Sequence, residues 1–116
     1  MLPVIKIVSA RLSSEEIGAF LGHPFPDMIK FVADTRRGML ALGGELHADA
    51  EAILLEDGSQ QADLWGGNFF PRKPKHQQVD FTSLINIRPS AGNPSMDIRD
   101  AAVRAKMLAL VEQLLG

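Results

Sequence analysis

The stretch from Ile98 to Leu115 constrains the fold more than any other part of the sequence. Its apolar residues fall mainly at three- and four-residue spacing, at Val103, Met107, Leu110, Val111 and Leu114. This spacing gathers side chains on one face of an α-helix. An amphipathic helix must bury its apolar face against another element. We therefore predict a helix over 98–115 that packs on a sheet, with Asp97 as its N-cap.

Short apolar runs rich in β-branched residues, bounded by turn residues, predict the strands of that sheet. They are Val4–Val8, Met28–Ala33, Met39–Leu46, Leu64–Pro71 and Val79–Arg88. The turn residues from Asp34 to Gly38 join the second and third runs, so these two runs are expected to form a hairpin. The run Val79–Arg88 has the clearest alternation of the five, and we predict a full strand there.

Two shorter helices are predicted between the strands. Ser13 and Glu16 have the spacing of a capping box, so a helix should begin after Ser13 and end by Gly22. Asp49 is the expected cap of a second helix, over 50–57, with Gly58 as its stop. The resulting order is β-α-β-β-α-β-β-α. It predicts an α+β fold: one mixed or mainly antiparallel five-stranded sheet with three helices on one side.

Composition limits the class of protein. The chain has 116 residues, 46% of them hydrophobic and 22% charged, so we expect a single globular domain over 1–116. The formal net charge of −2 disfavours a general nucleic-acid coat protein, although a local basic patch stays open. There are no cysteines, which excludes disulfides and thiolate metal sites. The first apolar run is too short for a membrane span, so we expect a cytoplasmic protein with no membrane partner.

The stretch from Gly43 to Ser59 carries the highest density of reactive side chains. If the third strand reaches His47, alternation places Glu45 and His47 on the same face. His47 with Asp49 and Glu51 could hold a metal ion or transfer protons. The alternative, which we favour, is that Asp49 caps a helix and Glu51 is a first-turn acid placed by the helix dipole.

A second polar group lies in the segment from Asn86 to Ser95. Arg88, with Asn86 and Asn93 nearby, could hold a phosphate or carboxylate at two points. The favoured alternative is that Asn93 bonds its own turn and Arg88 pairs with a surface acid. If the third and fifth strands were neighbours, Glu45 and His47 would face Asn86 and Arg88 across one cleft.

Three blocks of sequence resemble the signature of a known group of proteins. GGELHADAEAILLEDGS, LWGGNFFP and SLINIRPSAGNPSMDI are similar to blocks of a small prokaryotic family of uncharacterised single-domain proteins, a domain of unknown function. The resemblance covers Asp27 to the C-terminal helix. It implies a single-domain prokaryotic protein and assigns no reaction, cofactor or catalytic residue.

Three hypotheses for function remain. The first is binding of a small anionic or polar ligand by Glu45, His47, Asn86, Arg88 and Asn93. The second is a metal-independent or metal-assisted hydrolase or ribonuclease, with His47 as proton shuttle, Glu45 as base and Arg88 stabilising negative charge. The third is a protein-partner or structural module with no small-molecule site. The sequence indicates neither a cofactor nor an oligomeric state.

Overall fold

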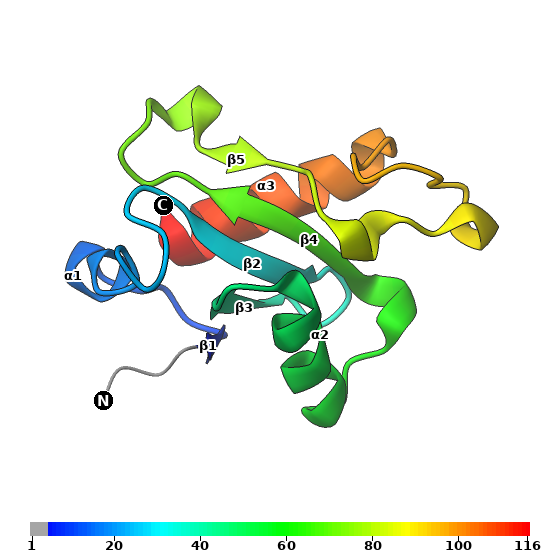
Figure 1. Cartoon of the computed structure of the whole chain (residues 1–116), viewed down its shortest axis with the longest axis horizontal. Helices are drawn as coiled ribbons and strands as arrows, with labels where there is room; N and C mark the ends of the chain where they lie inside the picture. Colours follow the sequence, from blue (N-terminus) through cyan, green and yellow to red (C-terminus); the bar gives the residue numbers. More distant parts are fainter. Residues whose placement is uncertain (1–4) are drawn as a thin grey trace.

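The chain folds around one antiparallel sheet of five strands in the order β1-β3-β2-β4-β5 (Figure 1). The computed structural model describes residues 5–116. The strands are β1 (Ile5–Val8), β2 (Ile29–Asp34), β3 (Met39–Gly43), β4 (Leu64–Phe69) and β5 (Val79–Asp80). Val4, which we expected to begin the first strand, lies outside the described residues. The predicted α+β class is confirmed, and the sheet is antiparallel at every pairing of these strands.

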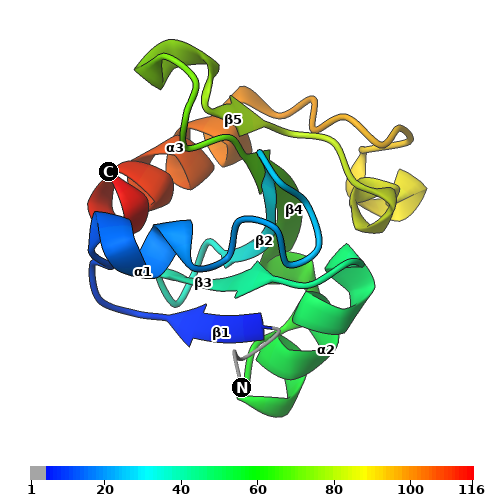
Figure 2. The same ribbon diagram turned by 60° about the vertical axis from the view of Figure 1, so that its left-hand side comes forward.

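Helices cover both faces of the sheet, not one face as we expected (Figure 2). They are α1 (Ser14–Gly18), α2 (His47–Glu56) and α3 (Ala101–Leu115). Short 3-10 helices lie at η1 (Gln61–Asp63), η2 (Lys75–Gln77), η3 (Leu84–Asn86) and η4 (Pro89–Ala91). Helices cover both faces because the successive residues of β2 and β4, which point to opposite faces of the sheet, are nearly all buried. A strand buried on both faces needs a covering layer on each.

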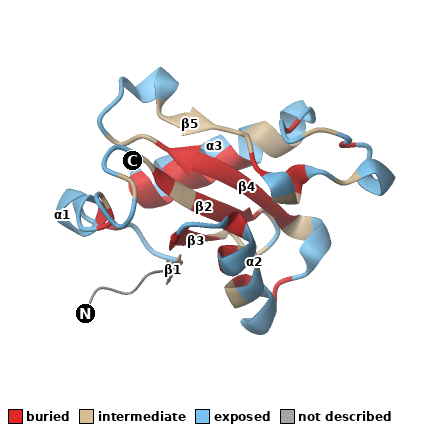
Figure 3. Cartoon of the chain, in the orientation of Figure 1, coloured by how far each residue is buried: buried red, intermediate tan, exposed pale blue. Residues whose placement is uncertain are grey.

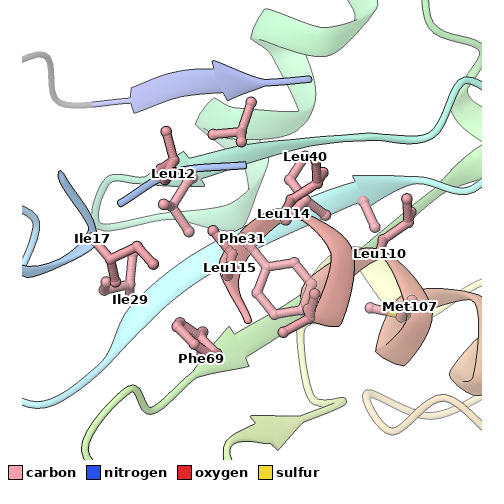
Figure 4. Packing of buried hydrophobic residues seen from close by; sticks show 14 of the residues in the cluster. Leu12, Ile17, Ile29, Phe31, Leu40, Phe69, Met107, Leu110, Leu114 and Leu115 are labelled. Carbon is pink, nitrogen blue, oxygen red and sulfur yellow. The ribbon is translucent and has the colours of Figure 1, made fainter. Parts of the chain in front are cut away.

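The larger core lies between the sheet and the pair α1 and α3. Phe31 and Leu40 point from the sheet toward Met107 and Leu114 of α3, and Phe69 closes the end near α1 (Figure 4). Phe31, Leu40 and Met107 are fully buried. The apolar stripe predicted for the last helix is therefore the face that packs on the sheet. Trp65 belongs to the same core.

A smaller core lies on the opposite face, beneath α2. Ala50 and Leu54 of α2 pack on Val32, Ala41 and Leu64 of the sheet. The central strands are buried while the loops and the outer side of α2 are exposed (Figure 3). Because α2 contains only 10 residues, it covers only part of this face.

Two local predictions are confirmed. Ser13 and Glu16 form the complete capping box at the start of α1, with each side chain accepting a hydrogen bond from the other's backbone N–H. β2 and β3 form the hairpin. In its turn, the buried Asp34 carboxylate accepts hydrogen bonds from the backbone N–H groups of Arg36 (3.0 Å) and Arg37 (2.8 Å). Both motifs depend on residues within four positions of one another.

The third strand is shorter than predicted and the second helix begins earlier. β3 ends at Gly43, because Gly43 and Gly44 both adopt positive φ and turn the chain out of the sheet. α2 then begins at His47, with Leu46 as an N-cap that makes no side-chain hydrogen bond. Asp49 is therefore a residue of the first turn of α2 and not its cap. Glu45 and His47 do not share a strand face.

The predicted strand over 79–88 is wrong beyond Asp80. The chain leaves β4 there and forms η3 instead, since the Ser83 hydroxyl accepts a hydrogen bond from the N–H of Ile85 and the Asn86 side chain turns inward. The last helix begins three residues later than expected. Its N-cap is Asp100, whose carboxylate accepts from Ala102 N (2.8 Å).

No helix among residues 5–116 is long and apolar enough to cross a membrane.

Candidate functional site

A cavity of about 480 Å³ lies on the α2 face of the sheet, beside the first turn of α2. Its floor is formed by β2, β4 and β5, and its far wall by residues 82–85 and Met96. We call this cavity the cleft. It occupies the part of the sheet face that α2 does not cover. Its volume lies within the range of about 300–1,000 Å³ that is typical of small-molecule sites.

A row of three polar residues crosses the floor of the cleft. Lys30 of β2 lies directly opposite Asn68 of β4, and Asn68 lies directly opposite Asp80 of β5. Residues directly opposite each other in an antiparallel sheet project from the same face. The register of three strands therefore brings Lys30, Asn68 and Asp80 together on the floor of the cleft, although they are far apart in the sequence.

Asn68 and Thr82 hold the Asp80 carboxylate in place. The Asn68 Nδ2 group donates to Asp80 Oδ2 (2.8 Å) and to the Thr82 carbonyl (3.1 Å), and Thr82 Oγ1 donates to Asp80 Oδ1 (3.1 Å). Because a carboxylate and a carbonyl only accept, these two contacts determine which way the Asn68 amide faces. Asn68 Oδ1 is consequently buried without a hydrogen-bond partner within the described part of the chain.

The two charged members of the row are not neutralised locally. Over residues 5–116, neither Lys30 nor Asp80 has an oppositely charged group within 4.0 Å. The Lys30 ammonium lies 5.5 Å from the centre of the Phe25 ring, a contact that leaves its charge available. The cleft thus has one cationic and one anionic side, with Asn68 between them.

His47 forms the side of the cleft at the start of α2. It is buried, and its Nε2 lies 2.7 Å from the carbonyl oxygen of Gly67. A carbonyl only accepts, so Nε2 carries the hydrogen and donates. In the neutral ring, Nδ1 is then the nitrogen that can accept a proton. Gly66 permits this packing, because a Cβ at that position would lie 3.2 Å from His47 Cδ2.

The surroundings of His47 favour its neutral form. Burial lowers the pKa of His47 below its ordinary value of 6.5, and the charge of Lys30 acts in the same direction. The Gly67 carbonyl, Asn68 and Asp80 oppose this shift without reversing it. His47 is therefore an uncharged hydrogen-bonding group near neutral pH.

Asn86, which we predicted to bind the ligand, is fully buried behind the wall of the cleft. Its Oδ1 accepts from Gly66 N (2.9 Å), and its Nδ2 donates to the carbonyls of Gly66 (3.0 Å) and Met96 (3.1 Å). Asn93 is also buried. Its Nδ2 donates to the Asn86 carbonyl (2.8 Å) and its Oδ1 accepts from Arg99 N (2.9 Å). Both asparagines hold the segment after β5 in shape, and neither lines the cleft.

Arg88, in the same segment after β5, does not line the cleft. Its guanidinium stacks on the Trp65 ring at 4.6 Å, donates to the Leu64 carbonyl, and lies 3.8 Å from Glu51. Burial lowers the pKa of Arg88, and Glu51 opposes that shift. Glu51 Oε2 and Arg88 Nη1 are buried without hydrogen-bond partners among the described residues. The pair connects α2 to the chain after η3.

The structure therefore brings together only part of the predicted site. Of Glu45, His47, Asn86, Arg88 and Asn93, only His47 lines the cleft, and Glu45 is exposed. The third and fifth strands are separated by β2 and β4, so the adjacency that we assumed for a shared cleft is absent. No group of three or more His, Cys, Asp or Glu residues within 5–116 is placed to hold a metal ion, so the structure gives the candidate set His47, Asp49 and Glu51 no support.

Sequence reasoning missed Lys30 and Asp80. Each is a single charged residue inside a short apolar run, in IKFVA and in VDF. Such an interruption is a usable signal, because a charge in the middle of a strand must reach solvent or a partner. The signal does not say which charged residues lie in the same cross-strand row, since only strand register decides that.

The chain matches a model of a protein family. A family model described as a protein of unknown function (DUF5674) matches residues 6–114. The resemblance to a family of unknown function is thereby confirmed over nearly the whole chain. No curated protein and no solved structure matches.

Proposed function

We propose that this chain, which belongs to the DUF5674 family of proteins of unknown function, binds a small polar ligand in the cleft beside α2. One observation carries the proposal: Lys30 and Asp80 lie in one cross-strand row on the floor of the cleft, and neither is paired with an opposite charge in the described chain. Charges held in a hollow without partners are suited to bind the polar groups of a ligand.

The rest of the lining supports a ligand that also has an apolar part. Leu46, Leu84 and Met96 line the cleft and remain 57%, 70% and 40% exposed. Large apolar side chains that are exposed around a hollow are typical of a binding site. Lys30 is the only Lys or Arg among the lining residues. A nucleic-acid strand is less suited to this cleft, because phosphate backbones are bound by several cations.

Amide NMR tests the proposal. A set of small carboxylates, amines, amino acids, nucleosides and sugars is titrated into the purified protein. We expect at least one compound to cause saturable shifts at Lys30, His47, Asn68 and residues 80–84. Asp80→Asn should weaken that binding where the compound carries a positive charge. Glu56→Gln, which removes one negative charge from the far end of α2, is the matched control and should not change it. If no compound in any class shifts the cleft residues, the proposal fails.

Hydrolysis is the second candidate, and the state of His47 favours it. A neutral imidazole whose Nε2 donates to the Gly67 carbonyl has Nδ1 as its proton acceptor, which is the state required of a general base. Lys30 would replace Arg88 as the group that stabilises negative charge, and Glu45 has no part because it does not line the cleft. His47→Ala distinguishes the two functions: it should abolish turnover of any compound that is hydrolysed, whereas a binding protein should lose only modest affinity.

A further inference from the structure

We infer that the ligand of the cleft is a zwitterion of the amino-acid type, with an ammonium group, a carboxylate and an apolar side chain. This inference rests on the proposed function and names the class of ligand. It follows from three features of the cleft: an acceptor-only side at Asp80, a cation at Lys30, and an apolar rim.

The Asp80 side of the row requires a positively charged donor. Both amide hydrogens of Asn68 are used, on Asp80 and on the Thr82 carbonyl, and the Thr82 hydroxyl donates to Asp80. What remains here is a carboxylate in a fixed orientation. A ligand group that binds this carboxylate must be a hydrogen-bond donor, and it must be positively charged to neutralise the carboxylate. An ammonium group provides both.

The Lys30 side requires an anion. Lys30 and Asp80 stand on strands separated by one intervening strand, so their backbones are about 10 Å apart, or two strand spacings. No ion pair joins the two residues. A ligand with a single charge would neutralise one of them and leave the other facing an occupied, less hydrated cleft. A ligand that carries an ammonium group and a carboxylate on one carbon can lie across Asn68 and contact both residues.

The rim of the cleft requires an apolar side chain on that ligand. Leu46 at the start of α2, Leu84 of η3 and Met96 expose apolar surface around the cleft. Burying such surface strengthens binding by roughly fourfold for each methylene group removed from water. Leucine or methionine should therefore bind more tightly than alanine, and alanine more tightly than glycine.

Three matched probes test the inference: L-leucine, 4-methylpentanoate, which lacks the ammonium group, and 3-methylbutylamine, which lacks the carboxylate. Affinities are measured by calorimetry and by amide NMR. We expect the affinity for leucine to be at least about tenfold higher than the affinity for either analogue, because each analogue loses a charge-assisted contact. Equal affinity of leucine and either analogue would overturn the inference.

Two variants locate each charged group. With Asp80→Asn, leucine should lose its advantage over 4-methylpentanoate and keep its advantage over 3-methylbutylamine. With Lys30→Met the pattern should reverse. Glu56→Gln should preserve both advantages, and NMR spectra of each variant establish that it is folded. If either variant leaves both advantages intact, the assignment of that residue is wrong.

The three probes and the wider set of compounds together distinguish failure of the inference from failure of the proposed function. If none of the three probes shifts the cleft residues but a nucleoside or sugar does, the zwitterion inference fails and the cleft remains a ligand site. If no compound of any class shifts the cleft residues, both fail together.

Discussion

The glycine pair of β4 lets groups approach both faces of the sheet at one point. A Cβ on Gly66 would lie 2.7 Å from Ser83 Cβ, on the cleft side. A Cβ on Gly67 would lie 2.6 Å from Phe31 Cζ, on the core side. Real Cβ atoms do not come this close to other carbons, so both positions exclude larger residues. Gly66 thus lets His47 and Ser83 approach the strand on the cleft side, and Gly67 lets Phe31 approach it on the core side.

Gly66→Ala should destabilise the protein by about 1–3 kcal/mol, the usual cost of forcing an extra carbon into a packed site. The Ser83 Cβ is close to its own backbone and cannot swing away, so the strand or η3 must shift. Urea denaturation measures the loss, and amide shifts at His47 and Ser83 should report the displacement. Gly18→Ala is the matched control, because a Cβ there has no neighbour within 4 Å. It should be neutral or stabilising by up to about 1 kcal/mol. Equal stability of the two variants would contradict this account.

At the scale of elements, α3 begins at a cap that the sequence pattern placed three residues too early. Asp97 and Asp100 both precede the apolar stripe and both can cap. The structure assigns the cap to Asp100, while Asp97 pairs with Arg104 at 2.8 Å on the surface. Pattern alone cannot choose between two suitable residues this close together.

Asp100→Ala should therefore cost about 1 kcal/mol of stability, because the N–H groups of the first turn of α3 lose their acceptor. Asp97→Ala should cost less, since an exposed ion pair contributes about 0–1 kcal/mol. Urea denaturation of both variants measures the difference in their free energies of unfolding. Asp97→Asn, which removes only the charge of the ion pair, is measured beside them. A larger loss for Asp97→Ala than for Asp100→Ala would show that the cap is wrongly assigned.

The elements that could be predicted are those with short-range causes. The capping box at Ser13, the β2–β3 hairpin and the stripe of α3 each depend on residues a few positions apart. The strand predicted over 79–88 failed because distant contacts decide its course. Asn86 bonds to the backbone of Gly66, 20 positions away, and this contact draws the chain out of the sheet. Alternation in the sequence does not reveal such a contact.

The candidate site could be predicted only in part for the same reason. His47 was identified from its own chemistry, and it does line the cleft. Lys30 and Asp80 line the same cleft only because β2, β4 and β5 are adjacent in a particular register. Arg88 and Asn86 were also chosen from their own chemistry, but grouping them with His47 assumed that the third and fifth strands are neighbours, and the observed order separates those strands. The chemistry of single residues was readable, but their grouping was not.

At the scale of the whole molecule, His47 links the cleft to the stability of the fold. It is the first residue of α2, it is buried, and it donates to the Gly67 carbonyl of the central sheet. Its lowered pKa is therefore a property of the folded chain, because unfolding returns the imidazole to water. Proton binding at this one group must then affect the folding equilibrium.

The sign of that effect follows from the direction of the pKa shift. The pKa of His47 is lowered from 6.5 in the folded protein, chiefly by burial. Between the folded value and 6.5, the unfolded chain binds more protons than the folded chain, so the free energy of unfolding falls as pH is lowered through 6.5 and is constant well above it. The lowered pKa of the exposed Glu16, which its Ser13 contacts cause, acts only below its ordinary value of 4.5. Urea denaturation between pH 7.5 and 5.0 therefore isolates the histidine region.

We expect His47→Gln to remove the contribution of His47 to this decline, because a glutamine can donate to the Gly67 carbonyl and does not titrate. His76→Gln, at an exposed position in η2, is the matched control and should retain the slope of the unmodified protein. A slope that is the same in the unmodified protein and in His47→Gln would mean that His47 is protonated equally in the folded and unfolded chains. In that case burial would not be what keeps the imidazole uncharged.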